Sequence, residues 1–320
     1  MSHIVITGAN GFVGHALSRV LLECGHTVTG VVRRAGTCVP GVSEWVFSGR
    51  DFDGLEAAWP AGLQADCIVH LAARVHVMRD DARDPDAAFR ATNVDGTLRV
   101  ADAARRHGVA RLVYVSSIKA VAETDAGQPL RETDPAAPQD AYGRSKRAAE
   151  DALRERQRRE GLDVVIARPP LVYGPEVRAN FLSLLNAVWK GIPLPLGAID
   201  AHRSLVFVDN LADALMHCAT DPRAANQCFH IADDEAPTVT ELLRRIGQHL
   251  DRPARLLPVP PGLLRAAGRL LRRSAQIERL TSDLRVDTAH LRATLDWQPP
   301  CSLDGGLAAT ARWYRSTHTA

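Results

Sequence analysis

The 320-residue sequence contains no apolar run near the ~20 residues that a helix needs to cross a bilayer, so we predict no integral membrane segment. Its formal net charge is only +2, which gives no reason to expect nucleic acid as a partner. No signal peptide precedes the first apolar segment, which starts almost at the first residue. These absences predict a cytoplasmic protein.

Cysteine is sparse and scattered, with six residues and no C-x-x-C pair. We therefore predict reduced thiols and no disulfide framework. The twelve histidines show no ligand spacing either, so we predict no metal site. With 46% apolar and 24% charged residues, the composition is ordinary for a globular enzyme.

Apolar segments of strand length alternate with helical patterns in the first half of the chain. Such alternation is typical of an α/β protein with a parallel sheet and helices on both faces, whose ligands bind at the carboxyl ends of the strands. We expect helices at 87–107 and 142–160. The expected strands are residues 4–7, 28–32, 45–47, 67–71, 112–115 and 164–167.

After residue 168 the character of the sequence changes, because prolines become frequent and strand signals become short. We predict a dinucleotide-binding domain at 1–168 and a smaller, mainly helical substrate lobe at 169–320. Residues 204–208 and 228–231 could return strands to the first sheet.

Three glycines follow the first expected strand at once, as Gly8, Gly11 and Gly14, and a helical pattern comes directly after them. Glycines here allow a tight turn and a close helix–strand contact, and they leave backbone N–H groups and a positive helix end facing a pyrophosphate. The bland alternative is a glycine-rich turn of any α/β protein. In this context we predict a Rossmann-type dinucleotide site.

The second expected strand ends in Arg33 and Arg34, with no acidic residue for the ribose hydroxyls that NAD presents. An arginine at this place can accept a 2′-phosphate. We therefore favour NADP(H), with NAD(H) possible; two exposed loop arginines are the alternative.

Tyr142 and Lys146 are four residues apart, so on a helix they share one face. The ammonium group can stabilise a phenolate and lower the tyrosine pKa from its usual ~10, which suits proton transfer to or from a hydroxyl. Asp140 is a plausible N-cap for this helix. The alternative is two unrelated surface residues.

The expected strand at 112–115 ends in Ser116 and Ser117, at the sheet edge where ligands dock. A hydroxyl there could hold a sugar hydroxyl or ketone toward Tyr142. A serine of an ordinary strand-end turn is the alternative.

Together these motifs resemble the extended short-chain dehydrogenases, the NAD-dependent epimerase/dehydratase family. The resemblance covers nearly the whole chain. It includes residues 7–14, 70–73, 93–97, 168–175, 203–209 and 295–299, beside the serine, tyrosine and lysine.

The resemblance implies roles for individual residues. The family's catalytic serine lies 25 residues before the tyrosine, which favours Ser117 over Ser116. The implied catalytic residues are Ser117, Tyr142 and Lys146. The implied cofactor residues are Gly8, Asn10, Gly11, Phe12, Val13, Gly14, Arg33, Arg34, Leu71, Ala72, Ala73, Asn93, Tyr142, Lys146 and Pro169. The implied substrate residues are Ser117, Tyr142, Asn180 and Arg203, where Arg203 would contact a nucleotide diphosphate or else pair with Asp209 or Asp213.

The closest-looking subgroup contains UDP-hexose 4-epimerases and the 4-keto reductases that form UDP-N-acetylquinovosamine for bacterial surface polysaccharide. Because a reductase consumes NADPH at each turnover, we expect reduction of the C4 ketone of a UDP-4-keto-hexose. A UDP-hexose or UDP-N-acetylhexosamine 4-epimerase is the alternative, and a non-catalytic NADP-sensing protein is a remote one. Dehydration is disfavoured, since Ile118 and Lys119 stand where family dehydratases carry Asp-Glu. The family also implies a homodimer through the helices at 87–107 and 142–160.

A basic amphipathic stretch lies near residue 270. We interpret it as a helix of the second lobe that packs its leucines inward; contact with a membrane surface is the alternative. Its residues are Leu263, Leu264, Arg265, Arg269, Leu270, Leu271, Arg272 and Arg273.

Overall fold

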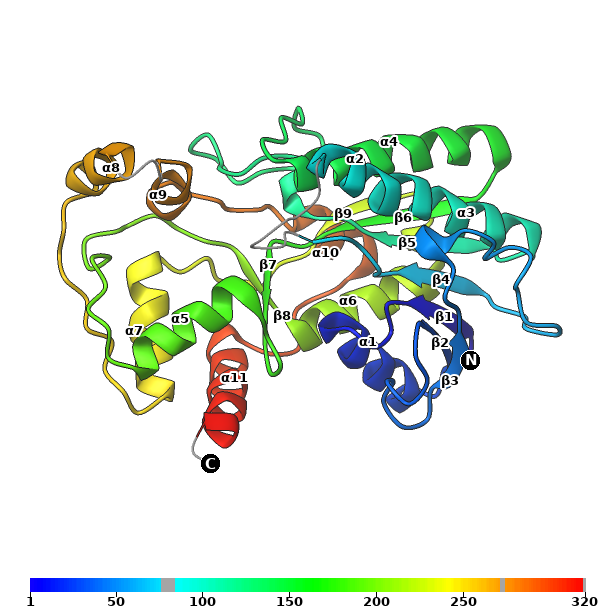
Figure 1. Ribbon diagram of the computed structural model, residues 1–320, viewed down its shortest axis with the longest axis horizontal. Helices are drawn as coiled ribbons and strands as arrows, with labels where there is room; N and C mark the ends of the chain where they lie inside the picture. The colour runs from blue at the N-terminus through cyan, green and yellow to red at the C-terminus, as the bar shows by residue number, and fades with distance from the viewer. Residues whose placement is uncertain (76–83, 271–273, 319–320) are drawn as a thin grey trace.

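A seven-stranded parallel sheet forms the centre of the computed structural model, which describes residues 1–75, 84–270 and 274–318 (Figure 1). The strand order is β3-β2-β1-β4-β5-β6-β9. This confirms the predicted Rossmann-type α/β fold. The strands are β1 His3–Thr7, β2 Thr27–Val32, β3 Ser43–Val46, β4 Cys67–His70, β5 Arg111–Val115, β6 Asp163–Arg168 and β9 Cys228–His230.

Successive strand residues point to opposite faces of the sheet, so each strand supplies two cores. In β1, Ile4 and Ile6 belong to one buried cluster, whereas Val5 belongs to the other. Helices α1 (Phe12–Glu23) and α6 (Val208–Thr220) contribute to the first cluster; α3 (Gly96–Arg106) and α4 (Ala141–Glu160) contribute to the second. The strands are therefore buried on both sides, which explains their continuous apolar runs.

The chain after β6 is mainly helical, and a short second sheet pairs β7 (Leu171–Tyr173) with β8 (Leu205–Phe207). Buried residues of the chain after β6, such as Phe181, Leu243 and Leu307, belong to the same core as Ile4. The remaining helices are α5 Ala179–Trp189, α7 Val239–His249, α8 Pro261–Leu270, α9 Ser274–Thr281, α10 Ala289–Leu295 and α11 Leu303–His318. No helix among the described residues is both long and apolar enough to cross a membrane.

Two expectations about the second half have different outcomes. Residues 228–231 do return to the first sheet, as β9 beside β6. Residues 204–208 do not; they form β8, which pairs with β7 in register Leu171↔Leu205. The pairing is supported by a tertiary contact, because the Tyr173 and Phe207 rings pack 5.6 Å apart between their centroids, and β7 itself follows β6 after only two prolines. The division at residue 168 stays a prediction.

The expected helix at 87–107 is two helices, α2 (Pro85–Arg90) and α3, joined by a π-helical turn at Ala91–Asp95. Such turns accommodate one extra residue in a helix and commonly occur at functional sites. Here the turn carries Asn93, whose side chain is used in the site described below.

Candidate functional site

The glycine loop after β1 has the geometry that the sequence predicts. Gly8 has a φ of +74°, and the Gly11 N–H donates to the Gly8 carbonyl at 3.0 Å. A Cβ on Gly14 would lie 2.3 Å from the Gly8 oxygen, and one on Gly8 would lie 3.0 Å from the Ala72 nitrogen. Helix α1 begins without a side-chain cap or an acidic residue in its first turn. Its first N–H groups are thus available to an anion, which fits a dinucleotide pyrophosphate. Asn10 lies in this turn, and Phe12 and Val13 are the first two residues of α1.

A buried hydrogen-bond chain connects this loop with the segment after β4. Thr7 Oγ1 lies 2.7 Å from His70 Nδ1, and His70 Nε2 lies 3.1 Å from Thr97 Oγ1. The Thr97 hydroxyl donates to the Asn93 carbonyl, so His70 Nε2 must donate to Thr97 and Nδ1 must accept from Thr7. Burial and the nearby charge of Lys146 lower the pKa of His70 to about 3. A neutral His70 therefore holds the strand ends that carry Leu71, Ala72 and Ala73.

Asn93 ties this segment to the helix of the candidate tyrosine. Its side chain accepts from the Arg74 N–H at 2.8 Å and donates to the Arg74 carbonyl at 3.0 Å. It also donates to Ser145 Oγ in α4 at 2.9 Å. Asn93 is only 1% exposed, so its amide is a positioning group within the fold.

Arg33 and Arg34 are exposed in the bend after β2. The following loop is pinned by Glu44 of β3, which accepts from the backbone N–H groups of Gly36, Thr37 and Cys38 at 2.6–2.9 Å. Both arginines are thus at the predicted place.

Ser117, Tyr142 and Lys146 come together where β5 ends and α4 begins. Asp140 caps α4 as predicted, accepting from the Gly143 N–H at 2.7 Å. The Lys146 ammonium donates to the Val115 carbonyl at 2.8 Å and lies 5.9 Å from the Tyr142 ring centroid.

The ionisation of this group differs from the expectation. Burial raises the pKa of Tyr142 to about 12, a shift that a hydrogen bond from Ser117 opposes. Burial also lowers the pKa of Lys146 to about 7. The expectation of a lowered tyrosine pKa is therefore wrong, because desolvation of the phenolate outweighs the hydrogen bond from Ser117.

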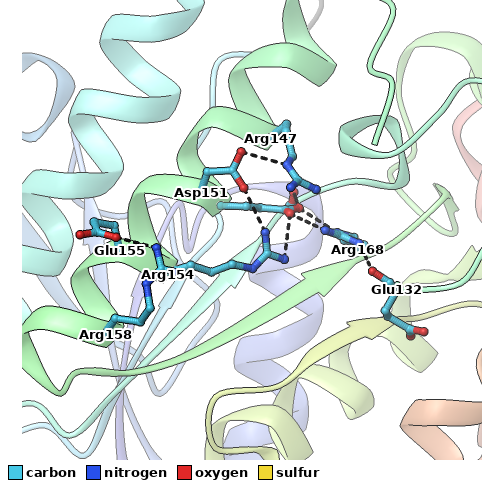
Figure 2. A network of polar contacts seen from close by, with 9 residues as sticks. Glu132, Arg147, Asp151, Arg154, Glu155, Arg158 and Arg168 are labelled. Atoms are coloured by element: carbon cyan, nitrogen blue, oxygen red, sulfur yellow. Dashed lines mark hydrogen bonds and ion pairs between the residues drawn. The ribbon is translucent and has the colours of Figure 1, made fainter. Parts of the chain in front are cut away.

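Ser116 is a poorer candidate than Ser117 for the catalytic serine, because its hydroxyl makes a buried structural hydrogen bond. It is 4% exposed and donates to Glu150 Oε1 at 2.6 Å. Arg168, at the end of β6, donates two hydrogen bonds to the same carboxylate, from Nε at 2.9 Å and from a terminal nitrogen at 2.6 Å. Figure 2 shows Arg168 beside charged side chains of α4, among them Arg147, Asp151 and Arg154. The sequence analysis missed Glu150, although its position four residues after Lys146 places it on the same face of the helix.

A second ionic cluster joins the cap of α4 to the C-terminal lobe. Lys119 Nζ lies 2.7 Å from Asp140 and 3.2 Å from Glu123. Arg279 of α9 lies 2.7 Å from Glu123 and 3.6 Å from Asp140. Lys119 stands where family dehydratases carry an acid, and here it is a structural cation.

The other two implied substrate residues, Asn180 and Arg203, lie in the part of the chain after β6. Asn180 is exposed near the start of α5. Arg203 is half-buried, and one of its terminal nitrogens is buried with no hydrogen-bond partner among the described residues. Burial lowers the pKa of Arg203, while Asp283, Glu123 and Asp125 act in the opposite direction. The alternative pairing with Asp209 or Asp213 is not seen. A half-buried guanidinium with one buried, unsatisfied nitrogen fits an anionic ligand. Pro169 is buried, and its carbonyl accepts from the Ile118 N–H at 3.0 Å.

A glycine turn between β1 and α1, together with a Ser–Tyr–Lys group between β5 and α4 of a Rossmann-type sheet, defines the class of extended short-chain dehydrogenases. The chain belongs to the NAD dependent epimerase/dehydratase family, whose sequence model matches residues 4–232. It is therefore an enzyme of the NAD-dependent sugar-nucleotide class, and not the non-catalytic alternative.

Known proteins similar to the chain include several 4-epimerases. A UDP-glucose 4-epimerase from Vibrio cholerae is 39% identical over 312 residues, covering 97% of this chain and 94% of that protein. An N-acetyl-alpha-D-glucosaminyl-diphospho-ditrans,octacis-undecaprenol 4-epimerase from Escherichia coli O157:H7 is 27% identical, and the match covers 82% of this chain and 77% of that protein. The crystal structure of a Thermotoga maritima UDP-glucose 4-epimerase with UDP-glucose superposes with a TM-score of 0.77 at 23% identity, covering 98% of this chain and 99% of that one. At that identity the likeness establishes the fold alone.

Proposed function

We propose that the protein interconverts the C4 epimers of a UDP-hexose or UDP-N-acetylhexosamine, with NAD as its cofactor. The observation that carries the proposal is the grouping of Ser117, Tyr142 and Lys146 where β5 ends and α4 begins, with the Lys146 ammonium 5.9 Å from the Tyr142 ring centroid. The 39% identity to a UDP-glucose 4-epimerase supports it. The reductase reading, which the sequence analysis preferred, takes second place because the similar proteins favour epimerisation.

The residues of the chain would divide the work between holding and proton transfer. The turn at Gly8 and Gly11 and the start of α1 would hold the pyrophosphate of the dinucleotide, whose nicotinamide supplies hydride chemistry at C4. Ser117 would hydrogen-bond the C4 oxygen, and Tyr142 would exchange a proton with that oxygen. Lys146 would stabilise the phenolate form by its charge.

Arg203 would bind the diphosphate of the substrate. Its unsatisfied nitrogen can donate to a phosphate oxygen, and the buried setting strengthens that bond. The relatives named above act on sugars carried by UDP or by a diphospho-lipid, and both carriers present a diphosphate. We favour UDP.

Reduction of a UDP-4-keto-hexose with NADPH is a second candidate, favoured by one observation. Arg33 and Arg34 are exposed at the end of β2, and Glu44 nearby is engaged with three backbone N–H groups. A 2′-phosphate would find cations at this place and no free acid at the strand end.

We also propose a homodimer that pairs through α3 and α4. Charged side chains on the outer face of α4 already pair within the chain, for example Arg147 with Asp151 at 3.0 Å (Figure 2). Contacts between two copies there would therefore be largely polar. Sedimentation equilibrium of the purified protein would show a dimer, whereas a monomer at all concentrations would contradict the proposal.

Proton NMR of the purified enzyme with UDP-glucose or UDP-N-acetylglucosamine tests the epimerase directly. We expect the C4 epimer to form to equilibrium without net change in cofactor, and Tyr142→Phe to abolish turnover. Consumption of NADPH with a UDP-4-keto sugar, and no epimerisation, would favour the reductase instead.

A further inference from the structure

The segment at 252–277 differs in charge from the rest of the chain. It contains six arginines and no lysine, aspartate or glutamate. Because the whole chain has a net charge of only +2, the remainder is net acidic. The positive charge is therefore concentrated in a short part of the C-terminal lobe. Its arginines are Arg252, Arg255, Arg265, Arg269, Arg272 and Arg273; the last two, like Leu271, lie outside the residues that the structure describes.

Helix α8, within this segment, exposes an apolar stripe to solvent. Leu263 is 63% exposed and Leu270 is 85% exposed, and Ala266 and Ala267 are exposed between them. These positions follow the i, i+3, i+4, i+7 pattern, so they share one face of the helix. Only Leu264 and Gly268 of α8 are buried. The expectation that the leucines pack inward is thus right for Leu264 and wrong for Leu263 and Leu270.

The residues before α8 extend this surface. Leu257 is 49% exposed, and Pro258 and Pro260 are exposed. Helix α8 lies at one end of the molecule, far from the edge strand β3 (Figure 1). Three largely exposed leucines, Leu257, Leu263 and Leu270, thus lie in one short segment at an outer end of the molecule, and exposed apolar side chains gathered in this way indicate an interaction site.

Arginines border the apolar stripe. Arg265 turns toward α9, where Glu278 lies 3.7 Å away and the Thr281 hydroxyl 3.3 Å away. Arg269 is exposed, and no ion pair of its side chain is found within the described part of the chain. Arg265 thus has an acidic partner in Glu278, and the positive charge beside the stripe is carried by Arg269.

We propose that α8 and residues 257–260 form a docking surface for an anionic lipid bilayer. The leucines would enter the boundary between headgroups and acyl chains, and the arginines would bind the lipid phosphates. A second copy of the chain fits the surface less well, because a twofold contact would place like charges against each other. The inference does not depend on which sugar the enzyme converts.

Co-sedimentation of the full-length protein with vesicles tests the proposal. One vesicle set contains phosphatidylcholine alone, and the other contains phosphatidylcholine and phosphatidylglycerol in equal parts. We expect binding to the anionic vesicles that weakens as salt is raised. The double variant Leu263→Asp, Leu270→Asp should bind at least about tenfold more weakly, and Arg269→Glu should weaken binding as well.

The matched control is Val46→Asp, at the end of β3. Val46 is 52% exposed, and this substitution adds one negative charge, against two in the double variant, at a site away from α8. It should bind vesicles like the unchanged protein, and circular dichroism should show that all variants are folded. The proposal is wrong if the unchanged protein does not bind anionic vesicles. It is wrong, too, if the α8 variants bind these vesicles as strongly as Val46→Asp does. It is also wrong if the α8 double variant converts a dimer to a monomer without changing vesicle binding, because a second copy would then cover α8.

Discussion

Arg168 and Glu150 form a buried bidentate ion pair close to the candidate active site, with N···O distances of 2.9 Å and 2.6 Å. Their exposed fractions are 1% and 0%. Ser116 adds a third hydrogen bond to the Glu150 carboxylate, so one side chain of α4 holds the ends of both β5 and β6. Glu150 also opposes the burial that lowers the pKa of Lys146. The pair thereby links the stability of the fold to the charge of a candidate catalytic group.

Replacing Glu150 by glutamine should weaken both functions of this pair. It leaves the buried Arg168 charge uncompensated, and we expect the free energy of unfolding to fall by ~3–5 kcal/mol. The pKa of Lys146 should fall below its present value of about 7, since the carboxylate that raises it is lost. If activity needs the ammonium form, the alkaline limb of the pH–rate profile should move to lower pH.

Arg154→Gln is the control for that variant. Arg154 lies 3.4 Å from the same carboxylate, but its side chain is 29% exposed (Figure 2). Its loss should cost at most about 1 kcal/mol and leave the pH–rate profile in place. An unchanged alkaline limb in Glu150→Gln would show that Glu150 does not act through Lys146.

His70 should make the protein less stable in acid. Burial lowers its pKa to about 3, whereas an unfolded histidine titrates near ~6.5. Below pH ~6.5 this histidine is protonated in the unfolded chain but stays neutral in the folded protein. The free energy of unfolding therefore decreases as pH falls toward 3. From pH 7 to pH 5 we expect the free energy of unfolding to fall by about 2 kcal/mol through this group.

Urea unfolding at the two pH values measures this effect. His70→Asn should be less stable at pH 7 but should lose less stability between pH 7 and pH 5. His217→Asn is the control, because His217 is 38% exposed and keeps its access to water. Equal pH dependence in the unchanged protein and His70→Asn would contradict the assignment.

Arg33 and Arg34 should decide how strongly the enzyme binds a 2′-phosphate. Changing both to serine should weaken NADPH binding by about tenfold or more, because charge-assisted contacts to the phosphate are lost. NAD binding should stay within about twofold, since NAD has no such phosphate. Fluorescence titrations with NADH and NADPH measure both, and an equal loss for the two would place the arginines elsewhere in the cofactor site.

Arg203 should contribute to binding of the nucleotide diphosphate. Arg203→Ala removes a half-buried cation with an unsatisfied nitrogen, and we expect UDP to bind about tenfold to a hundredfold more weakly. Calorimetric titration with UDP gives the affinity. Arg223→Ala is the control, because Arg223 is paired with Asp221 at 2.8 Å on an exposed surface. Unchanged UDP affinity in Arg203→Ala would remove this residue from the site.

The sheet and the placement of the candidate residues could be predicted from the sequence, because both follow from local patterns. The apolar segment that starts at Ile4 predicts a buried strand. The i, i+4 spacing of Tyr142 and Lys146 predicts that they lie on one face of a helix. The partner of β8 could not be predicted, since pairing depends on tertiary contacts such as Tyr173 with Phe207. The pKa of Tyr142 could not be predicted either, because it follows from burial rather than from spacing.

The most direct test of the central claim uses UDP-glucose that carries deuterium at C4. In the proposed reaction the hydrogen leaves C4 and returns to the same carbon on the other face, without exchange with water. We predict that the epimer formed retains the deuterium at C4 and that Tyr142→Phe forms none. Formation of the epimer with hydrogen from solvent at C4 would contradict the account.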